Sequence, residues 1–160
     1  MRRPFRATRS AEEPTMNARS NAGFTLIETM CTVAIAGILS SVAYPGFTKL
    51  LNKARRADAK VALMNMHLAQ ERYRSDHLNY ASMSDLGIAA SSPAKHYTLS
   101  VESTTDTGFK AQAVAAGPQA SDANCRHLQV SVDGLAVTYQ SGSDATVSNS
   151  AEVNKQCWGL

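Results

Sequence analysis

The segment from Phe24 to Tyr44 constrains this chain more than any other part of its sequence. It reads FTLIETMCTVAIAGILSSVAY and holds one formally charged side chain, Glu28, in 21 residues. As an α-helix it would be roughly 30 Å long, the thickness of a bilayer's hydrocarbon core. A buried core helix fits less well, because a small domain rarely encloses a helix that is apolar on every side. A cleaved secretory signal also fits less well, because the run continues into a charged helical pattern. We expect a transmembrane helix over residues 24–44.

Glu28 is the anomaly of this segment. A carboxylate near the bilayer core costs on the order of a few kcal/mol unless it has a partner. No Lys or Arg lies between Phe24 and Ala43. Cleavage after Gly23 would create an α-amino group at Phe24, one helical turn from Glu28. That amine could neutralise the carboxylate in the same chain or in a neighbour. The alternative is that Glu28 lies near the helix end and extends its carboxylate to the membrane–water interface.

Basic residues are concentrated before the apolar segment. The chain of 160 residues has 16 Lys and Arg against 13 Asp and Glu, a formal charge of +3. Residues 1–23 hold five arginines and two glutamates, which is +3, so residues 24–160 hold 11 basic and 11 acidic groups. Without residues 1–23, charge gives no argument for nucleic-acid binding. The length allows one domain of ordinary size.

Residues 45–74 predict an amphipathic helix. Pro45 lacks a backbone donor and Gly46 weakens a helix, so we expect a kink or a locally melted turn there. Apolar or small residues form two stripes on nearly opposite sides. One stripe comprises Phe47, Leu50, Leu51, Ala54, Ala57, Val61, Met64 and Leu68, and the other Ala59, Ala62, Leu63, Met66, Ala69 and Tyr73. We expect one face to pack on its own domain and the other on neighbouring subunits; the alternative is a helix sandwiched inside one domain.

The C-terminal half reads as a small sheet. Residues 75–96 are rich in Ser, Ala and turn formers and predict a long connection. Strand-like stretches follow at Tyr97–Val101, Phe109–Val114, Leu128–Val132 and Leu135–Tyr139. Asp133-Gly134 is a two-residue hairpin signal, and Gly117-Pro118 ends the second strand. The expected class is α+β: a long N-terminal helix, membrane-spanning in its first half and amphipathic in its second, packed on a roughly four-stranded antiparallel sheet in residues 75–160.

The sequence offers no catalytic constellation. The four histidines are scattered (His67, His77, His96 and His127), and no Ser or Cys stands in a recognisable nucleophile context. There is no Gly-rich phosphate loop and no HExxH. Asp58 and Glu71 stand among Lys and Arg on the helix, where solvated pairs three or four residues apart are the default. We therefore expect neither enzymatic activity nor a cofactor.

The string Gly23-Phe24-Thr25-Leu26-Ile27-Glu28, with the apolar run after it, resembles the class III signal of type IV pilins and related pseudopilins. The resemblance implies that a prepilin peptidase cuts after Gly23 and N-methylates Phe24, and that Glu28 is the assembly glutamate. Residues 1–23 would be a cytoplasmic leader; Met16 offers a later start with a shorter leader. The segments QERYRSDHLNYASMSDLGI, YTLSVES and AGPQASDANCRHLQVSVDG, with the closing CW, are similar to PilE-like type IVa minor pilins.

This resemblance implies a non-catalytic pilus subunit that first crosses the bacterial inner membrane once, with a periplasmic C-terminal domain, and later enters an extracellular pilus. Its partners would be the prepilin peptidase, other pilin subunits and the inner-membrane assembly platform. The roles of the pilus would be adhesion, twitching motility or DNA uptake.

The positive-inside rule argues for the reverse orientation, because Lys49, Lys53, Arg55 and Arg56 follow the apolar span. The alternatives are a type II secretion pseudopilin and a DNA-binding or adhesive receptor pilin. Nucleic acid is not indicated, because the only cations beyond the helix are Lys95, Lys110, Arg126 and Lys155.

Cys125 and Cys157 both fall in the exported domain that the resemblance implies. In an oxidising periplasm their pairing is expected, and pilins typically use such a bond to hold the C-terminal loop. It would close a loop of about 33 residues and stabilise by roughly 3–4 kcal/mol on a chain-entropy model. A metal site with His127 beside Cys125 lacks CxxC or HxxxH spacing. Cys31, inside the apolar span, receives no role.

Overall fold

The computed structural model describes residues 23–160. These fall into two compact units that divide between Leu39 and Ser40. Residues 1–22, which belong to the predicted leader, and the alternative start at Met16 lie outside the described part. The first helix, α1 (Leu26–Asp76), continues from one unit into the other, and all other elements belong to the second unit.

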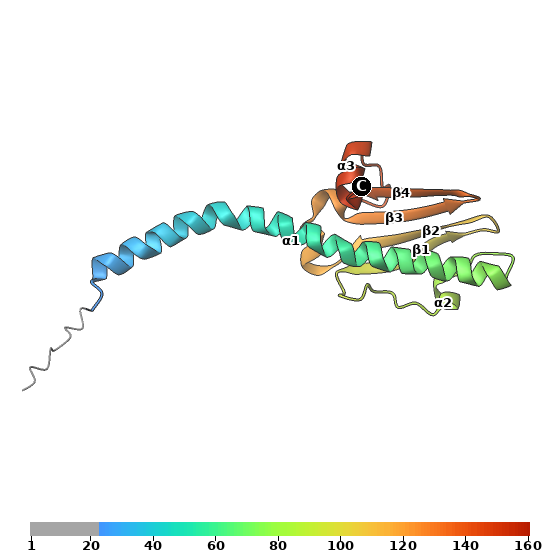
Figure 1. Cartoon of the computed structure of the whole chain (residues 1–160), viewed down its shortest axis with the longest axis horizontal. Coiled ribbons are helices and arrows are strands. Elements are labelled where there is room, and N and C mark those ends of the chain that lie inside the picture. Colours follow the sequence, from blue (N-terminus) through green and yellow to red (C-terminus); the bar gives the residue numbers. More distant parts are fainter. Residues whose placement is uncertain (1–22) are drawn as a thin grey trace, which may run out of the picture. The chain divides into compact units, whose positions relative to one another are not determined.

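A four-stranded antiparallel sheet forms the frame of the second unit (Figure 1). Its strands are β1 (Tyr97–Thr104), β2 (Gly108–Ala115), β3 (His127–Asp133) and β4 (Ala136–Gly142), in the spatial order of the sequence. Two short 3₁₀ turns, η1 (Gly117–Ser121) and η2 (Ala123–Cys125), connect β2 to β3. All four expected strands are present, each somewhat longer than predicted, so the α+β prediction is confirmed.

The core lies between one face of this sheet and α1, which crosses the sheet in Figure 1. Side chains that alternate along the strands point to α1, including Tyr97, Phe109 and Leu128. From the helix, Ala59, Leu63 and Met66 pack against them. The opposite face carries a row of paired polar residues, Ser100, Gln112, Gln129 and Gln140.

The two predicted stripes of α1 have different environments. Ala59, Ala62, Leu63 and Met66 are buried, as a helix that covers a sheet requires. On the other stripe Val61, Met64 and Leu68 remain 54%, 44% and 47% exposed. The alternative of a helix sandwiched inside one domain is therefore wrong for this unit. The described residues leave about half of each of the Val61, Met64 and Leu68 side chains uncovered.

The helix is unbroken through Pro45 and Gly46, so the predicted melted turn is absent. Proline removes the hydrogen bond that its own N–H would donate one turn back, and its ring crowds the carbonyl of that turn. The neighbouring turns keep their bonds, and the Thr48 hydroxyl donates to the Pro45 carbonyl at 3.0 Å.

The connection 75–96 is more ordered than predicted. It contains the one-turn helix α2 (Met83–Leu86), which a reciprocal capping box between Ser82 and Asp85 begins and Gly87, at φ 61°, ends. Its start is held to α1 because the Gln70 amide donates to the Ala81 carbonyl and accepts from the Ala81 N–H, both at 2.8 Å. Ser82-x-x-Asp85 is a recognisable sequence signal that the prediction did not use.

Two details near the C-terminus also differ from prediction. The β3–β4 turn consists of Gly134 and Leu135 instead of Asp133-Gly134, because Asp133 still pairs with Ala136. Gly134 supplies the positive φ of 58° that the tight turn requires. The helix α3 (Ala151–Trp158) was not predicted; it begins with the Ser150 side chain as N-cap and ends at Gly159.

Candidate functional site: the apolar helix and the disulfide-bonded region

The Gly23–Glu28 motif forms the start of α1. Thr25 and Glu28 have the spacing of a capping box, and the Thr25 hydroxyl accepts the Glu28 N–H at 3.3 Å. Phe24 is 82% exposed, and Glu28 is exposed one turn into the helix. Within residues 23–160, no ion pair involves the Glu28 carboxylate. The motif therefore presents a carboxylate that has no ion pair among residues 23–160, four residues after the Phe24 that the predicted cleavage would expose.

The residues that follow form an apolar helix that the protein does not bury. Every residue from Phe24 to Tyr44 is exposed. Of the helices in the described part, α1 is the one long and apolar enough to cross a membrane, with a mean hydropathy of 1.8 over its most apolar window. A core helix of a soluble domain would be covered by its own chain, so this exposure argues against that alternative.

A disulfide joins Cys125 at the end of η2 to Cys157 in α3, as predicted. Both residues are buried, and their Cα atoms lie 5.6 Å apart. The bond fixes α3 beside the segment that precedes β3. Further contacts tie α3 to β4: the Asn154 amide donates to the Tyr139 carbonyl and the Trp158 indole to the Gln140 carbonyl, at 2.7 and 3.0 Å.

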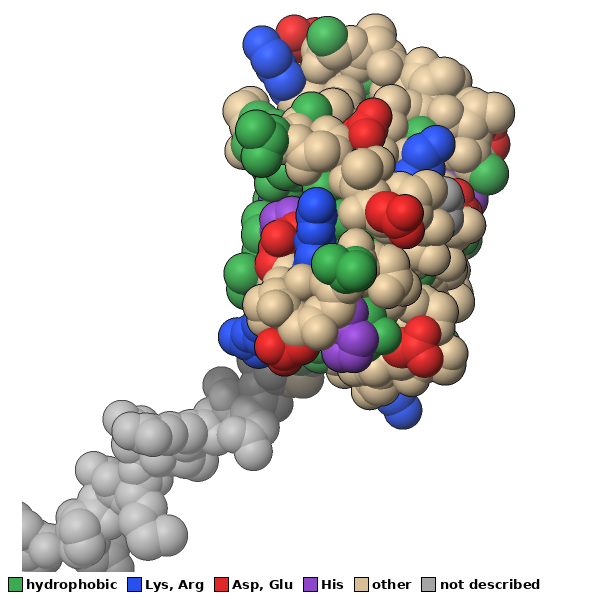
Figure 2. All heavy atoms as spheres, turned by 90° about the vertical axis from the view of Figure 1, so that its right-hand side faces the viewer, with side chains coloured by type: hydrophobic (Ala, Val, Ile, Leu, Met, Phe, Trp, Pro, Cys, Tyr) green, Lys and Arg blue, Asp and Glu red, His purple; other side chains and the backbone are tan. Residues whose placement is uncertain are grey.

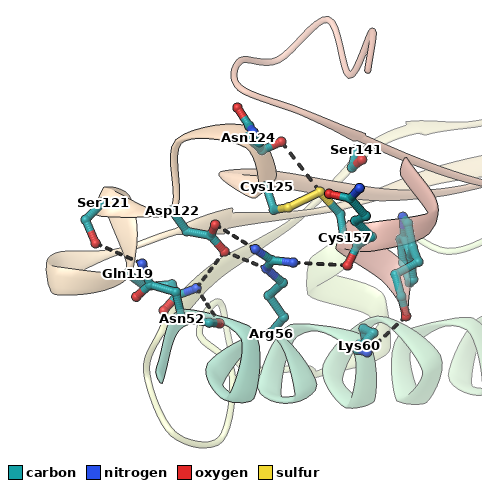
Figure 3. A network of polar contacts seen from close by, with 12 residues as sticks. Asn52, Arg56, Lys60, Gln119, Ser121, Asp122, Asn124, Cys125, Ser141 and Cys157 are labelled. Carbon is teal, nitrogen blue, oxygen red and sulfur yellow. Dashed lines mark hydrogen bonds and ion pairs between the residues drawn. A yellow bond between two sulfur atoms is a disulfide. The ribbon is translucent and has the colours of Figure 1, made fainter. Parts of the chain in front are cut away.

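Arg56 of α1 is the centre of a polar network beside this disulfide (Figure 3). Its guanidinium donates twice to the Asp122 carboxylate, at 2.6 and 2.8 Å, and once to the Gln156 carbonyl of α3, at 3.1 Å. The Arg56 and Asp122 side chains are only 14% and 8% exposed. One arginine thus connects α1, the segment between η1 and η2, and α3. A bidentate geometry of this kind fixes direction as well as distance.

Gln119 extends the network into the core. Its amide nitrogen lies within hydrogen-bond distance of the Tyr97 hydroxyl, the Asn52 carbonyl and Asp122 Oδ2, at 3.0, 3.2 and 3.2 Å. Burial of the Tyr97 phenol raises its pKa to about 12. A strand of the core is therefore linked through polar groups to the disulfide-bonded region.

Asp58 fixes the other side of α1. Burial alone would raise its pKa, but hydrogen bonds from the Ser92 hydroxyl and from the Ala94 and His96 N–H groups outweigh that effect, so the pKa lies below its ordinary value. Asp58 is thus not the solvated helix pair expected from sequence. Glu71 also differs, because it accepts a hydrogen bond from the Tyr80 hydroxyl at 3.2 Å.

Lys95, Lys110 and Arg126, three of the four cations that follow α1, do not form a continuous strip. Lys95 and Arg126 lie at the same end of the sheet, where Ala116 N–H binds the His96 carbonyl and Ala115 N–H the Arg126 carbonyl. Lys110, which pairs with Ser131, lies five positions from Ala115 in β2. At ~3.4 Å per residue, this places it about 17 Å from that end of the sheet. On the face turned to the viewer in Figure 2, charges of both signs are interspersed.

The described residues contain no group of three metal-ligating side chains, and Cys125 is occupied by its disulfide. The histidines are dispersed as expected; His127 contacts the Gln112 side-chain oxygen at 3.4 Å. The arrangement is that of a scaffold with an uncovered apolar helix.

Comparison with known families decides the assignment. Residues 45–129, just over half of the chain, match the family described as type IV minor pilin ComP, DNA uptake sequence receptor. The chain belongs to this family. Residues 18–44 of this minor pilin also match the prokaryotic N-terminal methylation motif, so the prediction of a type IV minor pilin is confirmed.

Curated relatives point to the same class. The minor pilin is 39% identical over 70 residues to the type IV major pilin protein PilA of Myxococcus xanthus, a match over 43% of this chain and 32% of that protein. It is 35% identical over 82 residues to a fimbrial protein of Neisseria meningitidis serogroup B, over 50% of this chain and 48% of that protein. The chain thus spans less than half the length of these relatives.

Proposed function

We propose that this minor pilin is a structural subunit of a type IV pilus, made as a membrane-inserted precursor and processed at Gly23. The observation that carries the proposal is the Gly23–Glu28 motif directly before an exposed apolar helix. The prepilin peptidase would cut after Gly23 and methylate Phe24. Residues 24–44 would then anchor the subunit, residues 45–74 would connect the anchor to the sheet, and residues 75–160 would form the pilin domain. Its role would be structural and not catalytic.

Glu28 would direct docking into the filament. The mature N-terminus carries a positive amine, and an apolar environment strengthens the attraction between unlike charges. A Glu28 carboxylate that enters a bundle of apolar helices without a partner is costly. Pairing with the N-terminus of a neighbouring subunit removes that cost. This one ionic contact would then set the position of each subunit along its neighbour.

The exposed face of α1 would supply further packing between subunits. Val61, Met64 and Leu68 add an exposed apolar surface in the second unit to that of residues 24–44. The other partners would be pilin subunits that contribute the same face and the inner-membrane assembly platform that adds them. Adhesion and twitching motility would be properties of the whole pilus.

The orientation with the C-terminal domain in the periplasm is supported by the Cys125–Cys157 disulfide, because such bonds persist in oxidising compartments. The cations after the apolar segment oppose this orientation by the positive-inside rule. Arg56, however, is one of these cations, and its contact with Asp122 gives it a role in the folded domain. Lys60 has one too, since it donates to the Trp158 carbonyl at 3.0 Å.

Intact mass of membrane-extracted protein tests the processing. We expect a chain that begins at methylated Phe24 and that gains two hydrogens on reduction.

In the same strain, Glu28→Gln should leave membrane insertion and processing intact and lower the amount of the subunit in sheared pili by at least tenfold. Glu102→Gln, an exposed glutamate of β1, is the matched control. An unprocessed N-terminus beside an active prepilin peptidase, or wild-type amounts of the Glu28→Gln variant in pili, would contradict the proposal.

A second candidate function is a DNA receptor within the pilus, and the match to a family described as DNA uptake sequence receptor supports it. Residues 24–160 carry 11 basic and 11 acidic groups, so long-range attraction to DNA would be weak. A receptor would then depend on base contacts, and its affinity would depend on sequence more than on salt. Fluorescence anisotropy of the detergent-solubilised chain with several duplexes, at two salt concentrations, measures both. Equal and strongly salt-dependent binding to every duplex would argue against this role.

A further inference from the structure

Four cations of α1 lie on one face of the helix: Lys49, Lys53, Arg56 and Lys60. Their spacing of four, three and four residues confines them to an arc of about 60° at ~100° per residue. This cation stripe borders the face that packs on the sheet. Its two C-terminal members are engaged in the fold: Arg56 binds Asp122 and the Gln156 carbonyl, and Lys60 binds the Trp158 carbonyl at the end of α3.

The two N-terminal members of the stripe are not engaged. Lys49 and Lys53 are exposed, and neither side-chain amine makes a hydrogen bond or ion pair with another residue in 23–160. With Lys155 of α3 they line a hollow of about 400 Å³ that also includes Glu152, Gly159 and Leu160. Arg56 lies at this hollow too, but Asp122 already neutralises it. Three lysine side chains and the Glu152 side chain thus face an open hollow.

The position of Lys49 in the chain limits what can reach this hollow. Lys49 is five positions after Tyr44, the last residue of the apolar segment, so the two are at most about 18 Å apart even in an extended chain. On a continuous helix the distance is about 8 Å at ~1.5 Å per residue. The headgroup layer extends about 5–8 Å beyond the hydrocarbon core on each side of a bilayer. With the apolar segment in the membrane, Lys49 would stand at the level of the lipid phosphates, and Lys53, about 14 Å from Tyr44 on the same helix, would lie one turn beyond it.

We propose that Lys49, Lys53 and Lys155 form a binding site for the phosphates of anionic phospholipids, which holds the globular unit against the membrane before assembly. The site rests on the membrane anchoring in the proposed function. Lipid is favoured over nucleic acid because residues 24–160 have no net charge and three amines neutralise few phosphates of a duplex. Entry into a filament would break these contacts. Lipid composition would then influence how readily the subunit leaves the membrane.

The single tryptophan of the chain gives a direct readout. Trp158 belongs to α3, whose neighbouring residues Lys155 and Gly159 line the hollow. The full chain is reconstituted in phosphatidylcholine vesicles with or without phosphatidylglycerol, with a dansyl-labelled headgroup lipid as energy acceptor. We expect transfer from Trp158 to increase with phosphatidylglycerol and to fall as salt is raised. Lys49→Gln with Lys53→Gln should lower the ratio of docked to undocked domain about 25-fold, at ~1 kcal/mol per lysine.

Variants of opposite effect make the test specific. Glu152→Gln removes the carboxylate at the hollow and should increase transfer in anionic vesicles. Arg72→Gln with Lys110→Gln removes the same charge elsewhere and should leave transfer unchanged. Trp158 emission and an intact disulfide report that each variant is folded.

Three results would overturn the site. Transfer that does not depend on phosphatidylglycerol would do so, as would an equal loss in the Arg72 and Lys110 control. If duplex DNA binds through Lys49 and Lys53 and anionic lipid does not, the ligand of the site is nucleic acid and not lipid. Vesicle flotation separately reports insertion: a chain that inserts without lipid-dependent transfer refutes only the site, whereas a chain that fails to insert refutes the proposed anchoring and the site together.

Discussion

Arg56 connects three segments that are far apart in the sequence, and its loss should be costly. Arg56→Ala leaves the Asp122 carboxylate, 8% exposed, without its partner. We expect the free energy of unfolding to fall by about 3 kcal/mol, because an uncompensated charge then stays largely buried. Arg55→Ala is the neighbouring control and should change stability by less than about 0.5 kcal/mol. Urea denaturation monitored by Trp158 fluorescence measures both, and equal effects would contradict the role of the ion pair.

Tyr97 should make the fold sensitive to alkaline pH. Its pKa is raised from 10.0 to about 12 by burial, so the unfolded chain loses the phenolic proton first. The resulting stability is present below about pH 10 and is lost between about pH 10 and pH 12, by roughly 2–3 kcal/mol. Tyr97→Phe removes the ionisation, at a cost of about 1 kcal/mol for the hydrogen bond with Gln119. Denaturation at neutral and alkaline pH should therefore show a smaller alkaline loss for the variant; parallel curves would exclude Tyr97 as the cause.

At the scale of elements, the disulfide should matter most for α3. Cys125→Ser with Cys157→Ser should lower the free energy of unfolding by about 2–4 kcal/mol. Arg56 and Asn154 still hold α3 by its Gln156 carbonyl and by β4, so we expect a weakened helix and not a lost one. Cys31→Ser, in the apolar segment, should not change the stability of the globular unit. Amide hydrogen exchange of residues 151–158 separates local loosening from global unfolding. Unchanged exchange there would show that the disulfide is dispensable for α3.

The elements differ in how much of them could be predicted from sequence. The helical spacing of apolar residues predicted both apolar faces of α1, and the alternation of apolar and polar residues predicted the strands. Both patterns are local, because they reflect which side of an element is buried. The eight residues of α3 make little more than two turns, too few for a hydrophobic period to be recognised, and only the caps at Ser150 and Gly159 mark its ends. The contact between Arg56 and Asp122 spans 66 residues and leaves no local signal. The same holds for Asp58, which looked like a solvated helix residue and instead binds the segment before β1.

For the whole molecule, the outstanding feature is that one helix has two apolar faces, of which one is buried on the sheet and the other is half-exposed. Ala59, Leu63 and Met66 must pack inside the chain for the sheet to be stable. Val61, Met64 and Leu68 are not needed for that, since about half of each remains exposed. Stability and assembly should therefore be separable by mutation on the same few turns of α1.

Val61→Gln, Met64→Gln and Leu68→Gln, combined in one chain, test this separation. Each change should alter the free energy of unfolding by less than about 0.5 kcal/mol, because surface substitutions have small effects. Incorporation into sheared pili should nevertheless fall at least tenfold, because burial of each polar amide between subunits costs about 1–3 kcal/mol. Leu78→Gln with Leu135→Gln removes two leucines that are 94% and 103% exposed elsewhere and is the control for lost surface apolarity. Equal incorporation of the α1 variant and the control would show that the exposed face of α1 is not an interface. A large drop in the stability of the α1 variant would instead show that this face supports the fold itself.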